Sequence, residues 1–99
     1  MPERDVKLSV IVPSYNRREE IEELLVSLEK QSILKSRFEV IIVDDGSIDD
    51  TEIWVMQFSG TTEMNITFVR QDHKGPGAAR NLGMQTATGD VFVFIDSDC

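Results

Sequence analysis

The stretch Val91-Phe92-Val93-Phe94-Ile95-Asp96-Ser97-Asp98 decides the fold, because it joins an apolar run directly to two carboxylates. The alternating Val and Phe residues over 91–95 predict a buried strand. Asp96 and Asp98 are two positions apart, so on an extended chain they point to the same side. In an open α/β sheet, ligands bind in the crevice at the carboxyl ends of the strands. The stretch therefore predicts such a sheet, with two oxygen ligands suited to Mg²⁺ or Mn²⁺ at its edge.

Upstream of this stretch, short β-branched runs alternate with amphipathic or small-residue segments. Further strands are predicted over 8–12, 38–43 and 66–69, and helices over 17–31, 50–58 and 77–86. Strands separated by helices favour a parallel sheet with right-handed crossovers. We therefore expect an α/β fold, a Rossmann-like three-layer α/β/α arrangement with a mainly parallel sheet of about four strands and three helices. Residues 1–99 have the length of a single domain.

The helix starts carry their own signals. Asn16 is predicted to cap the first helix, with Glu19 three residues later closing a capping box. The second helix is predicted to begin at Asp49, again with an acid, Glu52, three residues on. The third helix has a face of small residues, which predicts a close approach to a sheet or ligand; that face is Ala78, Ala79, Leu82 and Gly83.

Composition excludes several classes of protein. The net charge of −8 argues against a nucleic-acid partner, because phosphate backbones require a basic face. The single cysteine, Cys99, excludes an internal disulfide and fits a reducing compartment. Apolar runs are too short for a membrane span, and residues 1–7 are too short and polar for a signal peptide. We expect a cytoplasmic protein, peripheral to the membrane in its full-length form.

Two turns at the carboxyl edge of the predicted sheet offer groups for a nucleotide. Asp44 ends the second strand and is expected to face the crevice, where a carboxylate can accept hydrogen bonds from a base or ribose. Asp45, by contrast, also suits a turn or a helix cap. The turn over 13–17 brings Tyr15, whose ring can stack on or edge a flat base. That turn has no glycine, which argues against a dinucleotide-binding domain of the NAD type.

The segment 73–81 combines bases with a glycine-flexed helix start. The N-terminus of a helix favours anions, and cations nearby add to that preference. Arg80 could reach a phosphate or the base; the alternative is that it pairs with Asp44 or Asp98. His73 is expected to be merely exposed.

These segments, in this order, resemble the N-terminal, nucleotide-sugar-binding half of the family-2 glycosyltransferases, which have the GT-A fold. The resemblance covers nearly the whole chain from Leu8 onward. The matching segments are Leu8-Ser9-Val10-Ile11-Val12-Pro13-Ser14-Tyr15-Asn16, Val43-Asp44-Asp45-Gly46-Ser47 with Asp49 and Thr51, Gly77-Ala78-Ala79-Arg80-Asn81-Leu82-Gly83, Gly89-Asp90 and Asp96-Ser97-Asp98.

The resemblance implies a nucleotide-sugar donor, most often a UDP-sugar, and transfer of the sugar with inversion to an acceptor glycan or lipid-linked sugar. By position, it places Pro13, Tyr15 and Asp44 in the base pocket, with Asp44 accepting from uracil. It places Arg80 at the base or diphosphate. Asp96 would hold the ribose or a metal-bound water, and Asp98 would ligate Mn²⁺ or Mg²⁺, which neutralises the leaving group.

The catalytic base of this family lies after the Asp-x-Asp motif, and no residue here matches it. We therefore expect a donor-binding domain over 1–99, truncated after that motif, which binds nucleotide weakly and transfers nothing alone. Uncovered sheet surface predicts self-association. Two alternatives stay open: a non-catalytic nucleotide-binding or regulatory module, and a structural interaction fragment whose acids are only caps. The sequence does not identify the sugar or the acceptor.

Overall fold

The computed structural model describes residues 7–31 and 35–95 of the chain. Its elements follow in the order β1 Leu8–Ser14, α1 Arg18–Glu29, the 3₁₀ turn η1 Lys35–Arg37, β2 Phe38–Asp44, α2 Thr51–Ser59, β3 Asn65–Arg70, α3 Pro76–Thr86 and β4 Val91–Phe94. None of the helices in this part of the chain is long and apolar enough to cross a membrane.

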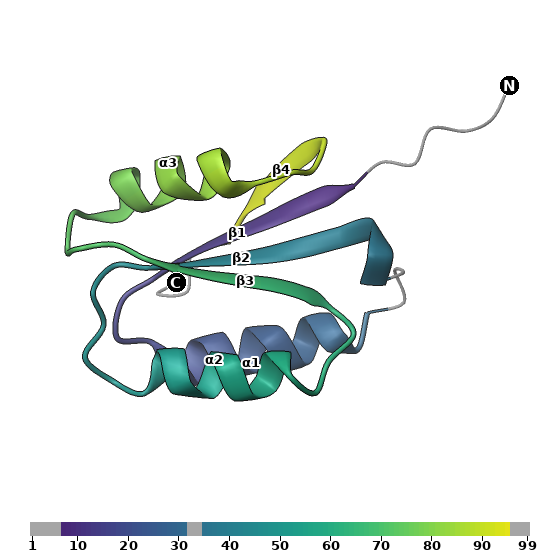
Figure 1. Cartoon of the computed structure of the whole chain (residues 1–99), viewed down its shortest axis with the longest axis horizontal. Helices are drawn as coiled ribbons and strands as arrows, with labels where there is room; N and C mark the ends of the chain where they lie inside the picture. Colours follow the sequence, from purple (N-terminus) through teal and green to yellow (C-terminus); the bar gives the residue numbers. More distant parts are fainter. Residues whose placement is uncertain (1–6, 32–34, 96–99) are drawn as a thin grey trace, which may run out of the picture.

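The four strands form one parallel sheet in the order β3-β2-β1-β4. Helices α1 and α2 cover one face of this sheet and α3 covers the other (Figure 1). The three-layer α/β/α prediction is therefore confirmed. Ser14 is in register with Asp44, and Asp44 with Arg70, so β1, β2 and β3 end at the same level. The segments that follow these three strands consequently meet at one edge of the sheet.

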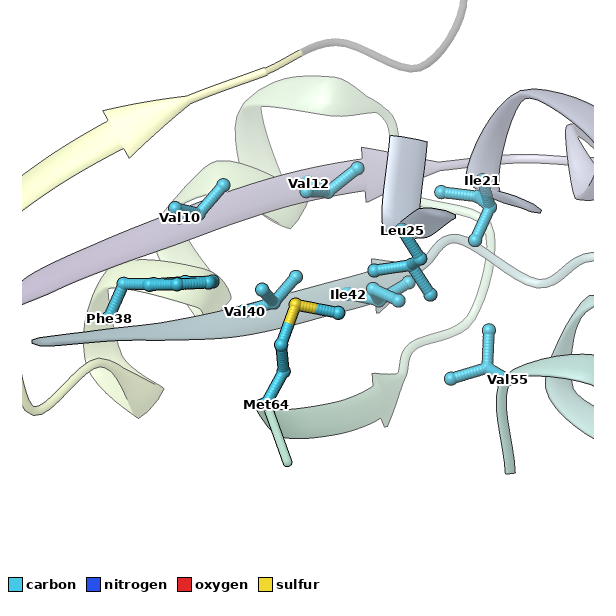
Figure 2. Packing of buried hydrophobic residues seen from close by; sticks show 9 residues of the cluster. All are labelled: Val10, Val12, Ile21, Leu25, Phe38, Val40, Ile42, Val55 and Met64. Atoms are coloured by element: carbon cyan, nitrogen blue, oxygen red, sulfur yellow. The ribbon is translucent and has the colours of Figure 1, made fainter. Parts of the chain in front are cut away.

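The core lies between the sheet and the pair α1 and α2. Its buried side chains come from all of these elements (Figure 2): Val10, Val12, Ile21, Leu25, Phe38, Val40, Ile42, Val55 and Met64. A smaller cluster under α3 contains Ile11, Ile41, Val43 and Ala79. Burying one such aliphatic side chain contributes about 1.5–3 kcal/mol, so the central strands β1 and β2, buried on both faces, carry most of this stabilisation.

β4 differs from its prediction. The alternating run predicted a buried strand, but Val91 is 46% exposed, Phe92 41% and Phe94 42%. The reason is its place at the edge: among the described residues, β4 pairs only with β1, and α3 packs on β1 and β2. The prediction of burial is therefore wrong for this chain, whereas that of a strand is right.

The predicted capping box of α1 is also wrong. Asn16 has a left-handed backbone, with φ 52°, and its Oδ1 accepts the Ile48 N–H at 2.8 Å. The first turn of α1 is served from elsewhere, because Asp49 Oδ2 accepts the Arg18 N–H at 3.3 Å. Asp49 Oδ1 also accepts the Thr51 N–H at 3.1 Å, at the start of α2. The side chain of Asp49 thus joins the two helix starts, and α2 begins at Thr51, one residue after the start of the predicted range 50–58 and two after Asp49.

Candidate functional site

A cleft of about 350 Å³ opens at the carboxyl edge of the sheet, between the β1–α1 turn and the start of α3. This volume is in the range of small-ligand sites. Its lining comes from three stretches of the chain: Pro13, Ser14, Tyr15 and Arg17; Asp45; and His73, Gly75, Pro76, Ala79 and Arg80. Three of the residues predicted from the sequence, Pro13, Tyr15 and Arg80, are therefore brought together in one cleft.

The carboxylate in this cleft belongs to Asp45, which is 5% exposed. Its Oδ1 accepts the Lys74 N–H at 2.7 Å and the Gln71 amide at 2.8 Å. Its Oδ2 accepts the Gly75 N–H at 3.0 Å and lies 3.0 Å from His73 Nδ1. Burial raises the pKa of Asp45, but the hydrogen bonds and His73 together hold that pKa below its ordinary value. Asp45 is therefore an anion at neutral pH.

Asp44 does not face the cleft, contrary to expectation. Its side chain is fully buried and accepts the Ser47 N–H at 2.9 Å and the Ser47 hydroxyl. Arg70 Nη1 lies 3.5 Å from its Oδ2. Successive side chains of a strand point to opposite faces, and Val40 and Ile42 face α1 and α2. Asp44 follows that alternation toward the helix pair, which leaves Asp45 on the α3 side with the cleft.

An aromatic contact closes one wall of the cleft. The rings of Tyr15 and His73 are 4.4 Å apart between centroids, with 35° between their planes. His73 Nδ1 also lies 3.2 Å from the backbone O of Asp45. The sequence prediction of a merely exposed His73 missed these contacts. The signal was its position three residues after β3, whose carboxyl end reaches the same edge as β1 and β2.

The cleft also contains positively charged groups. Arg17 and Arg80 both line the cleft, which also receives the N-terminal end of α3. That helix starts at Pro76 after Gly75, whose φ of 96° is a conformation that only glycine adopts readily. The first N–H groups of a helix have no partner within it, and its dipole favours anions there. The cleft therefore combines an anionic acceptor and an aromatic ring with two cations and the N-terminal end of a helix.

The predicted metal ligands, Asp96 and Asp98, lie outside the described residues. The chain just before them is placed by Ile95, whose N–H donates to the Ile11 carbonyl at 3.0 Å. Residue 95 thus lies beside the middle of β1, directly after the carboxyl end of β4. Within 7–31 and 35–95, no group of three or more His, Cys, Asp or Glu side chains is arranged to hold a metal ion.

An open parallel sheet with a polar cleft at its carboxyl edge defines a class, the α/β domains that bind nucleotides at that edge. Comparison with known proteins narrows this class. Residues 9–99 match the family described as Glycosyl transferase family 2. The chain belongs to this family, and the resemblance seen in the sequence is confirmed.

Two relatives show the extent of the similarity. The poly(ribitol-phosphate) beta-N-acetylglucosaminyltransferase TarS of Staphylococcus aureus, strain Mu50, is 41% identical over 93 residues, which are 94% of this chain and 16% of TarS. The crystal structure of TarS residues 1–349 in complex with UDP superposes with a TM-score of 0.84, covering 93% of this chain and 27% of that one.

The mannosyltransferase PcManGT from Pyrobaculum calidifontis, in complex with GDP-Man and Mn²⁺, superposes with a TM-score of 0.89 at 32% identity. The match covers 96% of this chain and 28% of PcManGT. The chain thus spans less than a third of each of these proteins. Both structural relatives are glycosyltransferases, which confirms the predicted GT-A fold.

Proposed function

We propose that this chain is the donor-binding portion of a family-2 glycosyltransferase. It binds a nucleotide-diphospho-sugar in the cleft at the carboxyl edge of the sheet, for inverting transfer of the sugar to an acceptor hydroxyl. One observation carries the proposal: the buried, ionised Asp45 faces the same cleft as the ring of Tyr15. A carboxylate beside an aromatic ring suits a planar base that carries an N–H donor on its ring.

The chemistry of the bases supports a uracil or guanine nucleotide. Each of these rings carries an N–H between two carbon atoms that a carboxylate can reach, whereas neutral cytosine and adenine present an unprotonated ring nitrogen at the corresponding edge. The structural relatives TarS and PcManGT are in complex with UDP and GDP-Man, respectively. Because TarS has the higher identity, at 41%, we propose a UDP-sugar as the donor.

The residue roles follow the position of each side chain. We propose that Pro13 and Tyr15 line the base pocket and that Asp45, in place of Asp44, accepts the ring N–H. Arg80, in the N-terminal half of α3, would support the base or the diphosphate. Asp44 instead supports the turn after β2 through Ser47.

Mn²⁺ or Mg²⁺ belongs to the proposal as well. Asp96 and Asp98 are hard oxygen ligands of the kind these ions prefer, and we propose that they hold the ion, with Asp96 also near the ribose. When bound, the ion supplies Lewis-acid stabilisation of the departing diphosphate. The Mn²⁺ in the PcManGT complex supports this assignment.

No described residue is assigned as the catalytic base. We propose an acceptor glycan or lipid-linked sugar, a cytoplasmic location, and no sugar transfer by residues 1–99 alone. The small share of the relatives that this chain spans supports the last point. The alternative function, a non-catalytic nucleotide-binding module, differs in one measurable respect, since it requires no metal.

Calorimetric titration of UDP, with Mn²⁺ and again with a chelator, tests the proposal. We expect metal-dependent binding that falls about tenfold or more in Asp45→Asn, because a hydrogen bond to a charged acceptor is lost. Asp98→Ala should remove the metal dependence. Asp44→Asn is the matched control, since Asp44 lies outside the cleft lining, and it should keep the preference for UDP over CDP even if it is less stable.

Each result has a clear reading. Binding that does not need metal and persists in Asp98→Ala would favour the non-catalytic module. Folded wild-type protein that does not distinguish UDP from CDP would contradict the role of Asp45. Folded protein that binds no nucleotide at all would contradict the donor site itself.

A further inference from the structure

His73 makes, with two residues of the cleft, the contacts that the proposed base would make. Its ring lies 4.4 Å from the ring of Tyr15, and its Nδ1 lies 3.0 Å from Asp45 Oδ2. Nδ1 is also 3.2 Å from the backbone O of Asp45. Because both neighbours are acceptors, Nδ1 carries its hydrogen here. The imidazole is thus a flat ring that packs against Tyr15, with 35° between the ring planes, and donates a ring N–H to Asp45, as a uracil could.

The acceptor sites of Asp45 are already used. A carboxylate has about four lone-pair sites, two on each oxygen. Lys74 N–H and the Gln71 amide donate to Oδ1, and Gly75 N–H and His73 Nδ1 approach Oδ2. A base can therefore give its ring N–H to Asp45 only if one of these four donors leaves.

His73 is the donor best able to leave. The N–H groups of Lys74 and Gly75 belong to the backbone that leads into α3, so they are held by the fold. Of the two side-chain donors, Gln71 is half-buried, whereas the side chain of His73 is 64% exposed. Rotation of the imidazole into water would break no contact of either hydrophobic cluster.

We infer that His73 occupies the base subsite and that a bound base displaces it. The inference rests on the proposed function and deepens it, because it makes His73 an internal competitor that sets the affinity for the base. The ligand class is a planar heterocycle with a ring N–H. Two other charged groups, Arg17 and Arg80, line the same cleft, and neither can imitate a flat aromatic ring with one N–H.

Uridine is the sharpest probe, because it has the base and no phosphate. We would titrate uridine into the chain by NMR and compare wild type with His73→Ala. The inference predicts about three- to tenfold tighter binding by His73→Ala, since a hydrogen bond that must be broken is gone.

His73→Phe, which keeps the ring and loses the N–H, should bind with intermediate affinity. Lys74→Ala is the matched control: it lies in the same turn, donates to Asp45 only through its backbone, and should match wild type.

A second readout follows the imidazole itself. The chain has one histidine and one tyrosine, so the ring C–H signals of His73 and Tyr15 are each unique in the spectrum. Uridine should move the His73 signals to the values of a solvent-exposed imidazole, as the ring of Tyr15 no longer shifts them. A purely structural role of His73 would leave these signals in place.

The outcomes separate the two proposals. Tighter binding by His73→Ala together with moving His73 signals supports both. If wild type binds uridine as tightly as folded His73→Ala or more tightly, the displacement is overturned while the base site stands. The same conclusion follows if the His73 signals stay fixed at saturation. Failure of every folded variant to bind uridine, UDP or UDP with Mn²⁺ contradicts the donor site, and the displacement with it.

Discussion

Gly83 of α3 lies against Ile11 of β1 so closely that the helix has no room there for a side chain. A Cβ on Gly83 would be 2.4 Å from Ile11 Cγ2 and 3.4 Å from Val43 Cγ2. This approach holds α3 on β1 and β2, and it therefore sets where α3 brings Arg80 to the cleft. The small-residue face predicted from the sequence is confirmed in this respect.

Gly83→Ala should destabilise the fold. Ile11 is fully buried and cannot move away, so overpacking costs about 1–3 kcal/mol, against a gain of up to about 1 kcal/mol in helix propensity. We expect a net loss in the free energy of unfolding, measured with urea. Gly77→Ala, in the same helix, is the control: nothing lies within 4 Å of its Cβ, so stability should hold or rise. Equal effects of the two substitutions would contradict the packing argument.

Glu39 should make the stability depend on acid pH. It is buried, and its Oε2 accepts the Ser9 hydroxyl at 2.6 Å and the Thr88 N–H at 2.7 Å. Burial raises the pKa of Glu39, but the hydrogen bonds have the larger combined effect and hold that pKa below its ordinary value of 4.5. A group whose pKa is lower in the folded state stabilises fully above its unfolded pKa. This contribution should therefore be complete above about pH 4.5 and disappear as the pH falls through the lower folded value.

Urea unfolding of wild type and Glu39→Gln across this range measures the effect. Glu39→Gln should lose about 1.5–3 kcal/mol at neutral pH, the usual worth of hydrogen bonds to a charged group, and its stability should depend less steeply on pH. Some dependence should remain, because the pKa values of Asp45 and Asp49 are also lowered below their ordinary value of 3.8. Parallel pH profiles for the two proteins would show that Glu39 is not responsible.

Two buried serines, Ser14 and Ser47, should respond differently to loss of their hydroxyls. Ser47 Oγ accepts the Asn16 N–H at 2.7 Å and donates to the buried Asp44. Ser14 Oγ, also buried, makes no hydrogen bond to any described residue. Ser47→Ala should therefore cost about 1–3 kcal/mol, whereas Ser14→Ala should change the free energy of unfolding little. Thermal or urea unfolding checks this, and a larger loss for Ser14→Ala would reverse the assignment.

The fold was predictable because its signals are local. Apolar runs such as 38–43 and the order of strands and helices follow from residues near one another in sequence. The capping of α1 was not predictable from the sequence, because the acceptor for the Arg18 N–H is Asp49, which belongs to another turn. The exposure of Phe92 and Phe94 was likewise unpredictable, because an alternating run does not reveal whether its strand is central or at the edge.

Three of the predicted site residues share one cleft, its carboxylate was misplaced by one position, and Asp96 and Asp98 lie outside the described residues. Pro13, Tyr15 and Arg80 lie together in the cleft, but the carboxylate there is Asp45 and not Asp44. Asp44 ends β2 and Asp45 follows it. The sequence does not tell which of the two faces α3, because the face of the strand that each side chain joins is known only from the packing. His73 was missed for a related reason, since its contacts with Tyr15 and Asp45 exist only when the ends of β1, β2 and β3 are level.

The edge strand β4 should make this chain associate with itself. Phe94, in register with Ile11 on the α3 side, is 42% exposed, and Val91 on the other face is 46% exposed. Among the described residues the outer edge of β4 is unpaired, and an exposed apolar edge is a template for pairing with another strand.

Sedimentation velocity at rising protein concentration should show dimers or larger species in wild type. In Phe94→Lys they should be reduced, because a charge on an edge strand opposes pairing. Ile53→Lys adds the same charge at an exposed apolar site, 64% exposed, on α2 and away from the edge, so it should leave association unchanged. Wild-type protein that stays monomeric at high concentration, or equal dissociation by both variants, would argue against the edge as the contact.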